Sequence, residues 1–492
     1  MKKSFSNCST VGKLMVLIGA LILFPLVVLV WYPEDSGYFT SFLIPGGASV
    51  LLGIAFCLFG KGDSEFSTNW KSSMGRSSLT VLFAWGWGVL IGALPFVFSG
   101  QLTMVQGLFE AVSGWTTTGL SVMDVSITPR IYLFHRSTMQ YCGGLGFIMV
   151  MILFISNKHA MGLYNAEGHP DKIMPNIKKT AQAIFVIYNF FLVVGSVAYR
   201  LAGMTWFDGI CHAMCSLSTG GFSTKLGSIG EYNSLSIEII TIVLMIIGTT
   251  NFAALLLLAK GRVRAFCRVS EVQFMFLVFL FVIPLTAVSL ADGLGISLLE
   301  GLRKAAFDVV SALSTTGYST MSYAGWPQFA IGMLILCMLI GGGIGSTAGG
   351  IKLSRVYLLL RMAGINIRKR LTPSRTVGAP CYVKATGKVP IDREAEEDTT
   401  GFVICYLTLF IVCSLLITVT ADCTLTEAMF DFASSIGTVG LSIGITGPMT
   451  NAPTLIIEMV GMLMGRLEIF IVLVGITFGF REIRDHLRRL RK

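Results

Sequence analysis

Charged side chains are scarce in this chain. Only 13% of its 492 residues are Asp, Glu, Lys or Arg, whereas 53% are hydrophobic. An ordinary soluble domain carries about 25% charged residues, so the composition argues against the soluble domains that the length alone would suggest. Residues 14–32 contain no charge at all. This run is long enough to cross a bilayer and predicts a membrane helix.

The same segment lacks the marks of a cleaved signal peptide, because residues 31–35 read Trp-Tyr-Pro-Glu-Asp and offer no small-residue cleavage site. Catalytic signatures are also missing: there is no His-Glu-x-x-His, no Ser/His pairing and no phosphate loop. Cys211 and Cys215 lie one helical turn apart, but no second pair completes a zinc site. The sequence therefore disfavours a membrane enzyme and predicts no organic cofactor.

The chain does contain a motif that occurs four times, in copies roughly a hundred residues apart, which is the mark of a repeat architecture. It reads Thr, a small or β-branched residue, Gly, a bulky apolar residue, Ser. The core residues of the four copies are Thr117, Thr118, Gly119; Thr219, Gly220, Gly221; Thr315, Thr316, Gly317; and Thr438, Val439, Gly440. Two adjacent glycines leave the alignment of the second copy ambiguous by one residue.

A short helix is expected before each loop. Polar residues recur nine positions before the motif glycine, and others recur one helical turn earlier, on the same face. The two sets are Glu110, His212, Asp308, Asp431 and Gln106, Asp208, Lys304, Glu427. For His212 the sequence favours a packed partner at a helix start over a proton carrier.

Apolar segments frame each loop. Two helices are predicted first, and a pair of helices then flanks each of the four loops. The expected ranges are 12–32 and 38–60; 77–99 and 129–157; 180–203 and 235–260; 271–291 and 326–362; and 400–421 and 453–478. The predicted fold is an all-α polytopic membrane protein, with four pseudo-fourfold helix–pore loop–helix repeats after two extra transmembrane helices. The expected segments are 1–72, 73–158, 159–262, 263–398 and 399–492.

Basic residues follow the second helix of every unit. The basic stretches are Lys158 to Lys179, Lys260 to Arg268, Arg361 to Arg393, and Arg481 to Lys492. By the positive-inside rule, both termini and these loops are cytoplasmic, and the Thr-Gly loops enter from outside. The net charge of +10 follows from this topology and does not indicate nucleic acid. Residues 363–399 are either a solvated linker of mixed charge or a docking surface for a soluble partner.

Four non-helical loops at membrane depth need a reason. Irregular backbone cannot face lipid and is tolerated only against protein or along a water-filled path. Four equivalent loops therefore suggest one central axis, on which glycines let backbone carbonyls point inward. A ring of carbonyls can replace the water shell of a bare cation. The sequence thus predicts a selectivity filter.

With these motifs, the chain resembles the Trk/Ktr/HKT superfamily of potassium transporters, and most of all the bacterial TrkH-type subunit. The resemblance implies K⁺ as substrate, held by backbone carbonyls of the filter residues, and glycine at all four filter positions matches the K⁺ pattern. It also implies a multi-pass protein of the bacterial cell inner membrane, a homodimer, and a cytoplasmic nucleotide-binding regulatory ring of the TrkA kind.

A Gly-rich string interrupts the predicted helix 326–362 on the cytoplasmic side of the filter. So many glycines should break a helix, and the resemblance implies an intramembrane gating loop. Its candidate gate residues are Gly341, Gly342, Gly343, Gly345, Ser346, Thr347, Gly349 and Gly350. Tight packing through small residues is the alternative. Lys352 and Arg355, just beyond, are expected to snorkel to the cytoplasmic surface.

Two further residues are assigned to the gate. Asn251 interrupts the helix 235–260 and either bonds to neighbouring backbone or lines a cavity near the gate. Arg466 lies in the middle of the predicted helix 453–478, where a charge is costly. It either forms an ion pair with Glu468 or Glu458, or faces the ion path below the filter; the resemblance implies the second role.

Gated K⁺ uptake is the leading function. The alternatives are a less selective Na⁺/K⁺ pathway and a proton-coupled cation symporter. A secondary transporter built from inverted repeats is disfavoured, because the halves of such a protein have opposite topology and these four units share one.

Overall fold

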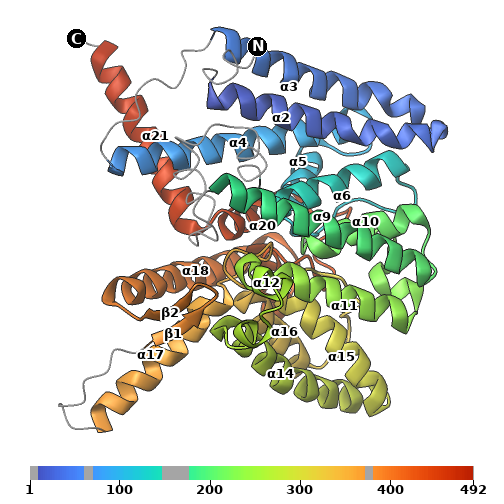
Figure 1. Ribbon diagram of the computed structural model, residues 1–492. Coiled ribbons are helices and arrows are strands. Elements are labelled where there is room, and N and C mark those ends of the chain that lie inside the picture. The colour runs from blue at the N-terminus through green and yellow to red at the C-terminus, as the bar shows by residue number, and fades with distance from the viewer. Residues whose placement is uncertain (1–8, 60–69, 147–176, 372–380, 491–492) are drawn as a thin grey trace.

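The computed structural model describes residues 9–59, 70–146, 177–371 and 381–490 as a bundle of helices with one small hairpin (Figure 1). The last part of the predicted helix 129–157 and most of the basic stretch from Lys158 to Lys179 lie outside these residues. Among the described residues, six helices are long and apolar enough to cross a membrane, or up to eight if each of two bent pairs is one span.

Two helices precede the repeats, as predicted. They are α2 (Thr10–Leu23), continued by the 3₁₀ segment η1 (Phe24–Val30), and α3 (Phe39–Phe59), reached through η2 (Pro33–Tyr38). The two helices lie side by side at one edge of the molecule (Figure 1). Their contact is lined by glycines: a Cβ atom on Gly19 would lie 2.7 Å from the Gly46 carbonyl oxygen and 2.9 Å from the Val50 amide nitrogen. Small residues thus let the two backbones approach closely.

Four units of the predicted kind follow. Each begins with a long first helix, continues with a short helix, and then turns into a second helix. The first helices are α4 (Trp70–Phe98), α9 (Ile177–Leu201), α14 (Ser270–Leu294) and α18 (Arg393–Thr420). The short helices are α5 (Met104–Trp115), α10 (Trp206–Leu217), α15 (Leu298–Leu313) and α19 (Leu425–Ile436). The second helices are α6 (Arg130–Leu145), α11 (Leu235–Thr249), α16 (Gln328–Ile340) and α20 (Ala452–Arg466).

Two of the second helices are bent sharply. The first bend lies at the predicted interruption by Asn251, whereas the prediction of an uninterrupted helix over 453–478 is wrong. After α11 the chain turns by 111° into α12 (Phe252–Ala259), and after α20 it turns by 103° into α21 (Ile469–Leu490). Glu468 adopts a left-handed backbone with φ of 59° at the second turn, which an α-helix cannot accommodate. The third unit breaks after α16, as the glycines predict, and resumes at α17 (Leu353–Leu371).

The connection between α17 and α18 departs from the all-α prediction. It contains an antiparallel hairpin of β1 (Cys381–Lys384) and β2 (Gly387–Pro390), in which Tyr382 pairs with Val389. The Val383 amide donates a hydrogen bond of 3.0 Å to the Ser270 hydroxyl at the start of α14. The linker of mixed charge is therefore partly ordered against the helices. The remaining short elements are η3 (Ser228–Tyr232) and α13 (Val263–Phe266).

The four units pack in a circle. The second helix of each unit contacts the short helix of the next: α6 with α10, α11 with α15, and α16 with α19. The circle closes because α20, near the end of the chain, contacts α5 of the first unit. The short helices therefore surround a common axis, and the loops that follow them meet there.

The contact between α2 and α3 generates a stability prediction. Replacing Gly19 by Ala should lower the midpoint of thermal unfolding, because the added methyl overlaps backbone atoms of α3 at a cost of about 1–3 kcal/mol. Gly47→Ala is the matched control, since a Cβ there meets nothing within 4 Å. Thermal unfolding of the purified proteins in detergent compares the two. Equal midpoints would show that glycine is not required at this contact.

Candidate functional site

The four short helices end in the same way. In the first, the amide of Thr118 donates to the Ser113 carbonyl at 2.9 Å and the amide of Thr117 donates to the Gly114 carbonyl at 3.1 Å. The same pair of bonds recurs at 2.8–3.2 Å after α10, α15 and α19. This pattern is the Schellman motif, which places the residue after the helix end in a left-handed conformation.

A threonine occupies that left-handed position in all four units. The φ angles are 55° at Thr117, 51° at Thr219, 56° at Thr315 and 51° at Thr438. Glycine is the usual residue there, and a β-branched residue with positive φ is strained. Strain that persists four times in equivalent places is typical of functional sites.

The motif glycines, two residues further on, also have positive φ, between 74° and 106°. This pattern resolves the ambiguity of the second copy, because Gly221 has a φ of 74° and Gly220 is not among the residues with positive φ. Gly221 is therefore the equivalent of Gly119, Gly317 and Gly440.

Each motif glycine lies against the loop of the next unit. A Cβ atom on Gly119 would overlap the carbonyl oxygen of Gly220, and one on Gly221 would overlap that of Thr316. In the same way Gly317 faces the carbonyl of Val439. The last contact closes the cycle, because Gly440 faces the carbonyl of Thr118 in the first unit. The four loops thus form a ring in which the middle residue of each motif presents its carbonyl to the neighbouring glycine.

Buried polar side chains hold these loops in place. The Glu110 carboxylate accepts from the Ser121 hydroxyl at 3.0 Å, and Asp431 accepts from the Ser442 hydroxyl at 2.7 Å. In the second unit the pair is His212 Nε2 and the Ser223 hydroxyl, 3.0 Å apart. The third unit differs by one residue, because Asp308 accepts from the Thr320 hydroxyl at 2.7 Å. These residues lie within the short helices, so the assignment of His212 to a helix start is wrong.

The residues one turn earlier cap their helices in three units. Thr103 with Gln106 and Thr424 with Glu427 form complete capping boxes, and the Thr205 hydroxyl accepts from the Asp208 amide. In the third unit the cap is Ser297 with Glu300, because α15 is 16 residues long where the other three short helices have 12. Lys304 therefore lies inside α15 rather than at its start.

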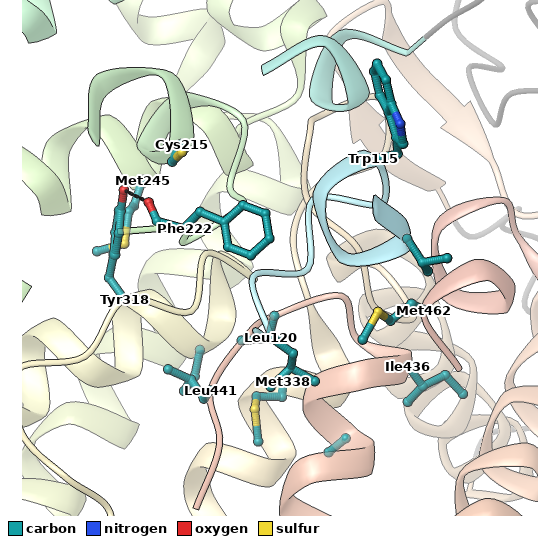
Figure 2. Close-up of a cluster of buried hydrophobic side chains, with 14 of the residues drawn as sticks. Trp115, Leu120, Cys215, Phe222, Met245, Tyr318, Met338, Ile436, Leu441 and Met462 are labelled. Carbon is teal, nitrogen blue, oxygen red and sulfur yellow. Dashed lines mark hydrogen bonds between the residues drawn. The ribbon is translucent and has the colours of Figure 1, made fainter. Parts of the chain in front are cut away.

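The bulky residue after each motif glycine is buried beside the ring. Leu120, Phe222, Tyr318 and Leu441 are each at most 3% exposed. Figure 2 shows them converging from four different loops, with the Tyr318 hydroxyl donating to the Phe222 carbonyl at 3.1 Å. The packing of these four side chains stabilises the loops directly after the motif glycines.

The Gly-rich segment between α16 and α17 packs directly against the threonines of the ring. The Thr347 hydroxyl lies 3.1 Å from that of Thr219, and the Gly349 amide donates to the Thr315 hydroxyl at 2.9 Å. A Cβ on Gly349 would overlap the hydroxyl oxygen of Thr438. The segment therefore contacts three of the four threonines, and only a residue without a side chain fits at position 349.

The Gly-rich segment also forms hydrogen bonds with the end of α11, at the break in the second unit. The Gly343 amide donates to the Thr249 carbonyl at 3.0 Å, and the Thr347 amide donates to the Gly248 carbonyl at 3.2 Å. Asn251 bonds to neighbouring backbone, because its side chain accepts from the Ala253 amide at 2.7 Å. It also lines a cavity of about 280 Å³ together with Ile344 of the Gly-rich segment.

Arg466 is the last residue of α20, not a mid-helix residue. Its guanidinium donates to the Thr347 carbonyl at 2.7 Å, and to the carbonyls of Gly143 and Gly144 at 2.5 and 3.2 Å. The arginine thus joins the Gly-rich segment to the end of α6. Glu468, one of its two suggested partners, forms an ion pair of 2.9 Å with Arg355.

The prediction that Arg355 snorkels to the cytoplasmic surface is wrong. The residue is 9% exposed, and its guanidinium lies 3.9 Å from the centre of the Phe402 ring. Lys352 donates from its ammonium group to the Ala348 carbonyl within the Gly-rich segment. Both cations are therefore turned toward the protein, since carbonyl and carboxylate oxygens are available there.

The structure adds one residue at the ring that the sequence analysis does not predict. Gln140 on α6 is fully buried; its amide donates to the carbonyl of Gly220, and its side-chain oxygen accepts from the Phe222 amide at 3.0 Å. An uncharged polar residue in an apolar segment gives a weak signal by itself, so only comparison with the other three second helices could have revealed it.

Fold and site together define a class: a polytopic membrane protein in which four equivalent loops converge on one axis. The TrkH family model, described as a cation transport protein, matches residues 47–478. The chain belongs to this family of membrane ion transporters and is not an enzyme.

Relatives agree over nearly the whole length. The Trk system potassium uptake protein TrkH of Escherichia coli K12 is 32% identical over 490 residues, which cover 96% of this chain and 98% of that protein. The protein of the same name from Halomonas elongata is 32% identical over 80% of this chain and 84% of its own. The crystal structure of the potassium transporter TrkH from Vibrio parahaemolyticus matches with a TM-score of 0.82 and 28% identity, covering 97% of this chain and all of that one.

The anchoring carboxylates generate a prediction. Asp431 accepts hydrogen bonds from Ser442, Ile443 and Thr446, so Asp431→Ala leaves several buried donors unpaired at about 1–3 kcal/mol each. We expect a lower midpoint of thermal unfolding together with reduced ion flux in liposomes. Asp422→Ala, at an exposed position just before α19, should change neither. Parental flux and midpoint in the Asp431 variant would refute the anchoring role.

Proposed function

We propose that this protein takes up K⁺ through a central path between the four Thr-x-Gly loops. The observation that carries the proposal is the closed ring, in which each motif glycine faces the carbonyl of the next unit. In this proposal the filter is Thr117 to Gly119, Thr219 to Gly221, Thr315 to Gly317 and Thr438 to Gly440. Its backbone carbonyls replace the water shell of the ion.

Glycine is required in such a ring for two reasons. Its positive φ is strained for residues with a side chain, and a Cβ would enter the space of the neighbouring carbonyl. The short helices also end beside the loops, and helix C-termini carry partial negative charge that favours a cation. The names of the relatives, which are potassium uptake proteins, support K⁺ as the ion.

In the proposed mechanism the Gly-rich segment gates the path. Its glycines at 341–343, 345, 349 and 350, with Ser346 and Thr347, cover the threonine side of the ring. Arg466 fixes this cover by donating to the Thr347 carbonyl. Its positive charge also disfavours a cation just below the filter. Opening requires the segment to leave the threonine hydroxyls and the break at Asn251.

The finer assignments remain predictions. They are the inner membrane of a bacterium, cytoplasmic termini, a homodimer, the TrkA-type regulatory ring and the segment boundaries. Channel-like flow and proton-coupled symport are distinguished by K⁺ flux into liposomes with and without an imposed pH gradient. A gradient that drives K⁺ accumulation would favour symport.

The filter assignment is tested at Gly317. Gly317→Ser should lower K⁺ flux and raise the Na⁺/K⁺ flux ratio by about tenfold or more. The added side chain displaces the Val439 carbonyl oxygen from the ring, and we expect the lost ion contact to cost at least as much free energy as one hydrogen bond. Complementation of a K⁺-uptake-deficient cell and liposome flux provide the measurements. Gly325→Ser is the matched control, since Gly325 also has positive φ but no atom near its Cβ position. A parental flux ratio in the Gly317 variant would contradict the assignment.

The gate assignment is tested at Arg466. Arg466→Ala removes the donors to the Thr347, Gly143 and Gly144 carbonyls, so the cover loosens and basal K⁺ flux should rise several-fold, in line with about 1–2 kcal/mol of lost hydrogen bonding. Arg361→Ala, an exposed arginine of α17, serves as the comparison. Unchanged or reduced basal flux in a folded Arg466 variant would rule out this role.

A further inference from the structure

The four second helices share one position at which the first unit differs. The position lies eleven residues after the N-cap of each helix, and the N-caps are Pro129, Ser234, Pro327 and Asn451. The residues at this position are Gln140, Met245, Met338 and Met462, and all four are fully buried. Figure 2 shows the three methionines in the buried cluster around the loops. Three units therefore present a thioether here, and only the first presents an amide.

The exception on α6 coincides with an exception in the loop that α6 contacts. The middle residue of the motif is threonine or valine in three loops, but it is Gly220 in the second. A Cβ atom on Gly220 would lie 2.5 Å from Gln140 Oε1 and 2.9 Å from its Nε2. The amide of Gln140 thus occupies the space that a side chain at position 220 would need. The two residues therefore form a matched pair.

The amide holds the loop on both sides of the motif glycine. Gln140 Nε2 donates to the carbonyl of Gly220, and Oε1 accepts from the amide of Phe222 at 3.0 Å. Gly221 lies between these two bonded groups. The corresponding carbonyls of the other loops, those of Thr118, Thr316 and Val439, accept no side-chain hydrogen bond from the part of the chain that the structure describes.

We infer that Gln140 is a specificity-determining residue: by binding the Gly220 carbonyl, it makes the ring unequal and sets the preference between K⁺ and Na⁺. This inference rests on the proposed function. Ion choice in a carbonyl filter depends on the strength of the oxygen dipoles and on how tightly they are held. An amide donor weakens one of the four oxygens and fixes its position, so that the ring cannot close on the smaller Na⁺.

The test compares Gln140→Met with the parent protein in liposomes, with K⁺ and Na⁺ fluxes measured separately. Met gives the first unit the residue of the other three, and it removes both hydrogen bonds while conserving an unbranched shape. The Na⁺/K⁺ flux ratio should rise by about tenfold, the equivalent of one lost buried hydrogen bond. Gln273→Met is the control, because Gln273 also donates from its side chain to a backbone carbonyl, that of Cys267, at the start of α14.

Two further variants keep the inference testable if Gln140→Met does not fold. Gln140→Glu retains an acceptor for the Phe222 amide, but an ionised carboxylate cannot donate to the Gly220 carbonyl. The double variant Gln140→Met/Gly220→Thr reproduces the pair found in the second and third units, Met245 with Thr316. Either should show the raised ratio, whereas Gly220→Thr alone should be poorly folded because it overlaps Gln140.

The outcomes separate the two levels of the proposal. If the parent protein passes no K⁺, the proposed function is wrong. If the parent is K⁺-selective and a folded Gln140 variant keeps the parental flux ratio, the function stands and the inference on Gln140 is wrong. A raised ratio in the Gln140 variants with an unchanged ratio in Gln273→Met supports it.

Discussion

Unpaired backbone groups cannot be left inside a membrane protein, and the centre of this structure depends on that constraint. Four short helices end in the interior of the protein, where each leaves its last carbonyl groups without a partner in the helix. The Schellman bonds at the four helix ends satisfy part of this demand, at the cost of a threonine in a left-handed conformation. The carbonyls left over point to the neighbouring loop. These carbonyls form the ring of oxygens, and of the four only that of Gly220 accepts a side-chain hydrogen bond from the described residues.

The same constraint explains why the Gly-rich segment fits where it does. Thr347 and Gly349 form hydrogen bonds with Thr219 and Thr315, and with the backbone exposed by the break after α11. The backbone groups left unpaired by the break in the second unit therefore form hydrogen bonds with those left unpaired by the break in the third. When the two separate, the polar backbone groups of each break need other partners, such as water.

Local chemistry made much of the fold predictable from sequence. Several features can be recognised from a short stretch of sequence. They are the Thr-x-Gly repeat, the charge-free spans and capping residues such as Thr103 and Thr424. The polar Asn251 marks the first sharp bend, but the bend at Glu468 has no such signal, because Leu467 and Ile469 flank it and its partner Arg355 lies in another unit. The burial of Arg355 is likewise not visible locally, because its carboxylate partner, Glu468, is distant in the sequence.

Fusion of four units in one polypeptide has a consequence for how such a ring can vary. In an assembly of identical subunits, symmetry copies every substitution fourfold, so an amide facing one loop would face all of them. Here a single gene encodes each quadrant separately, and the Gln140 and Gly220 pair occupies one quadrant while methionine fills the other three. In a ring built from four linked units, a substitution can therefore change one carbonyl at a time. The properties of the ring can then vary in small steps, rather than at all four positions at once.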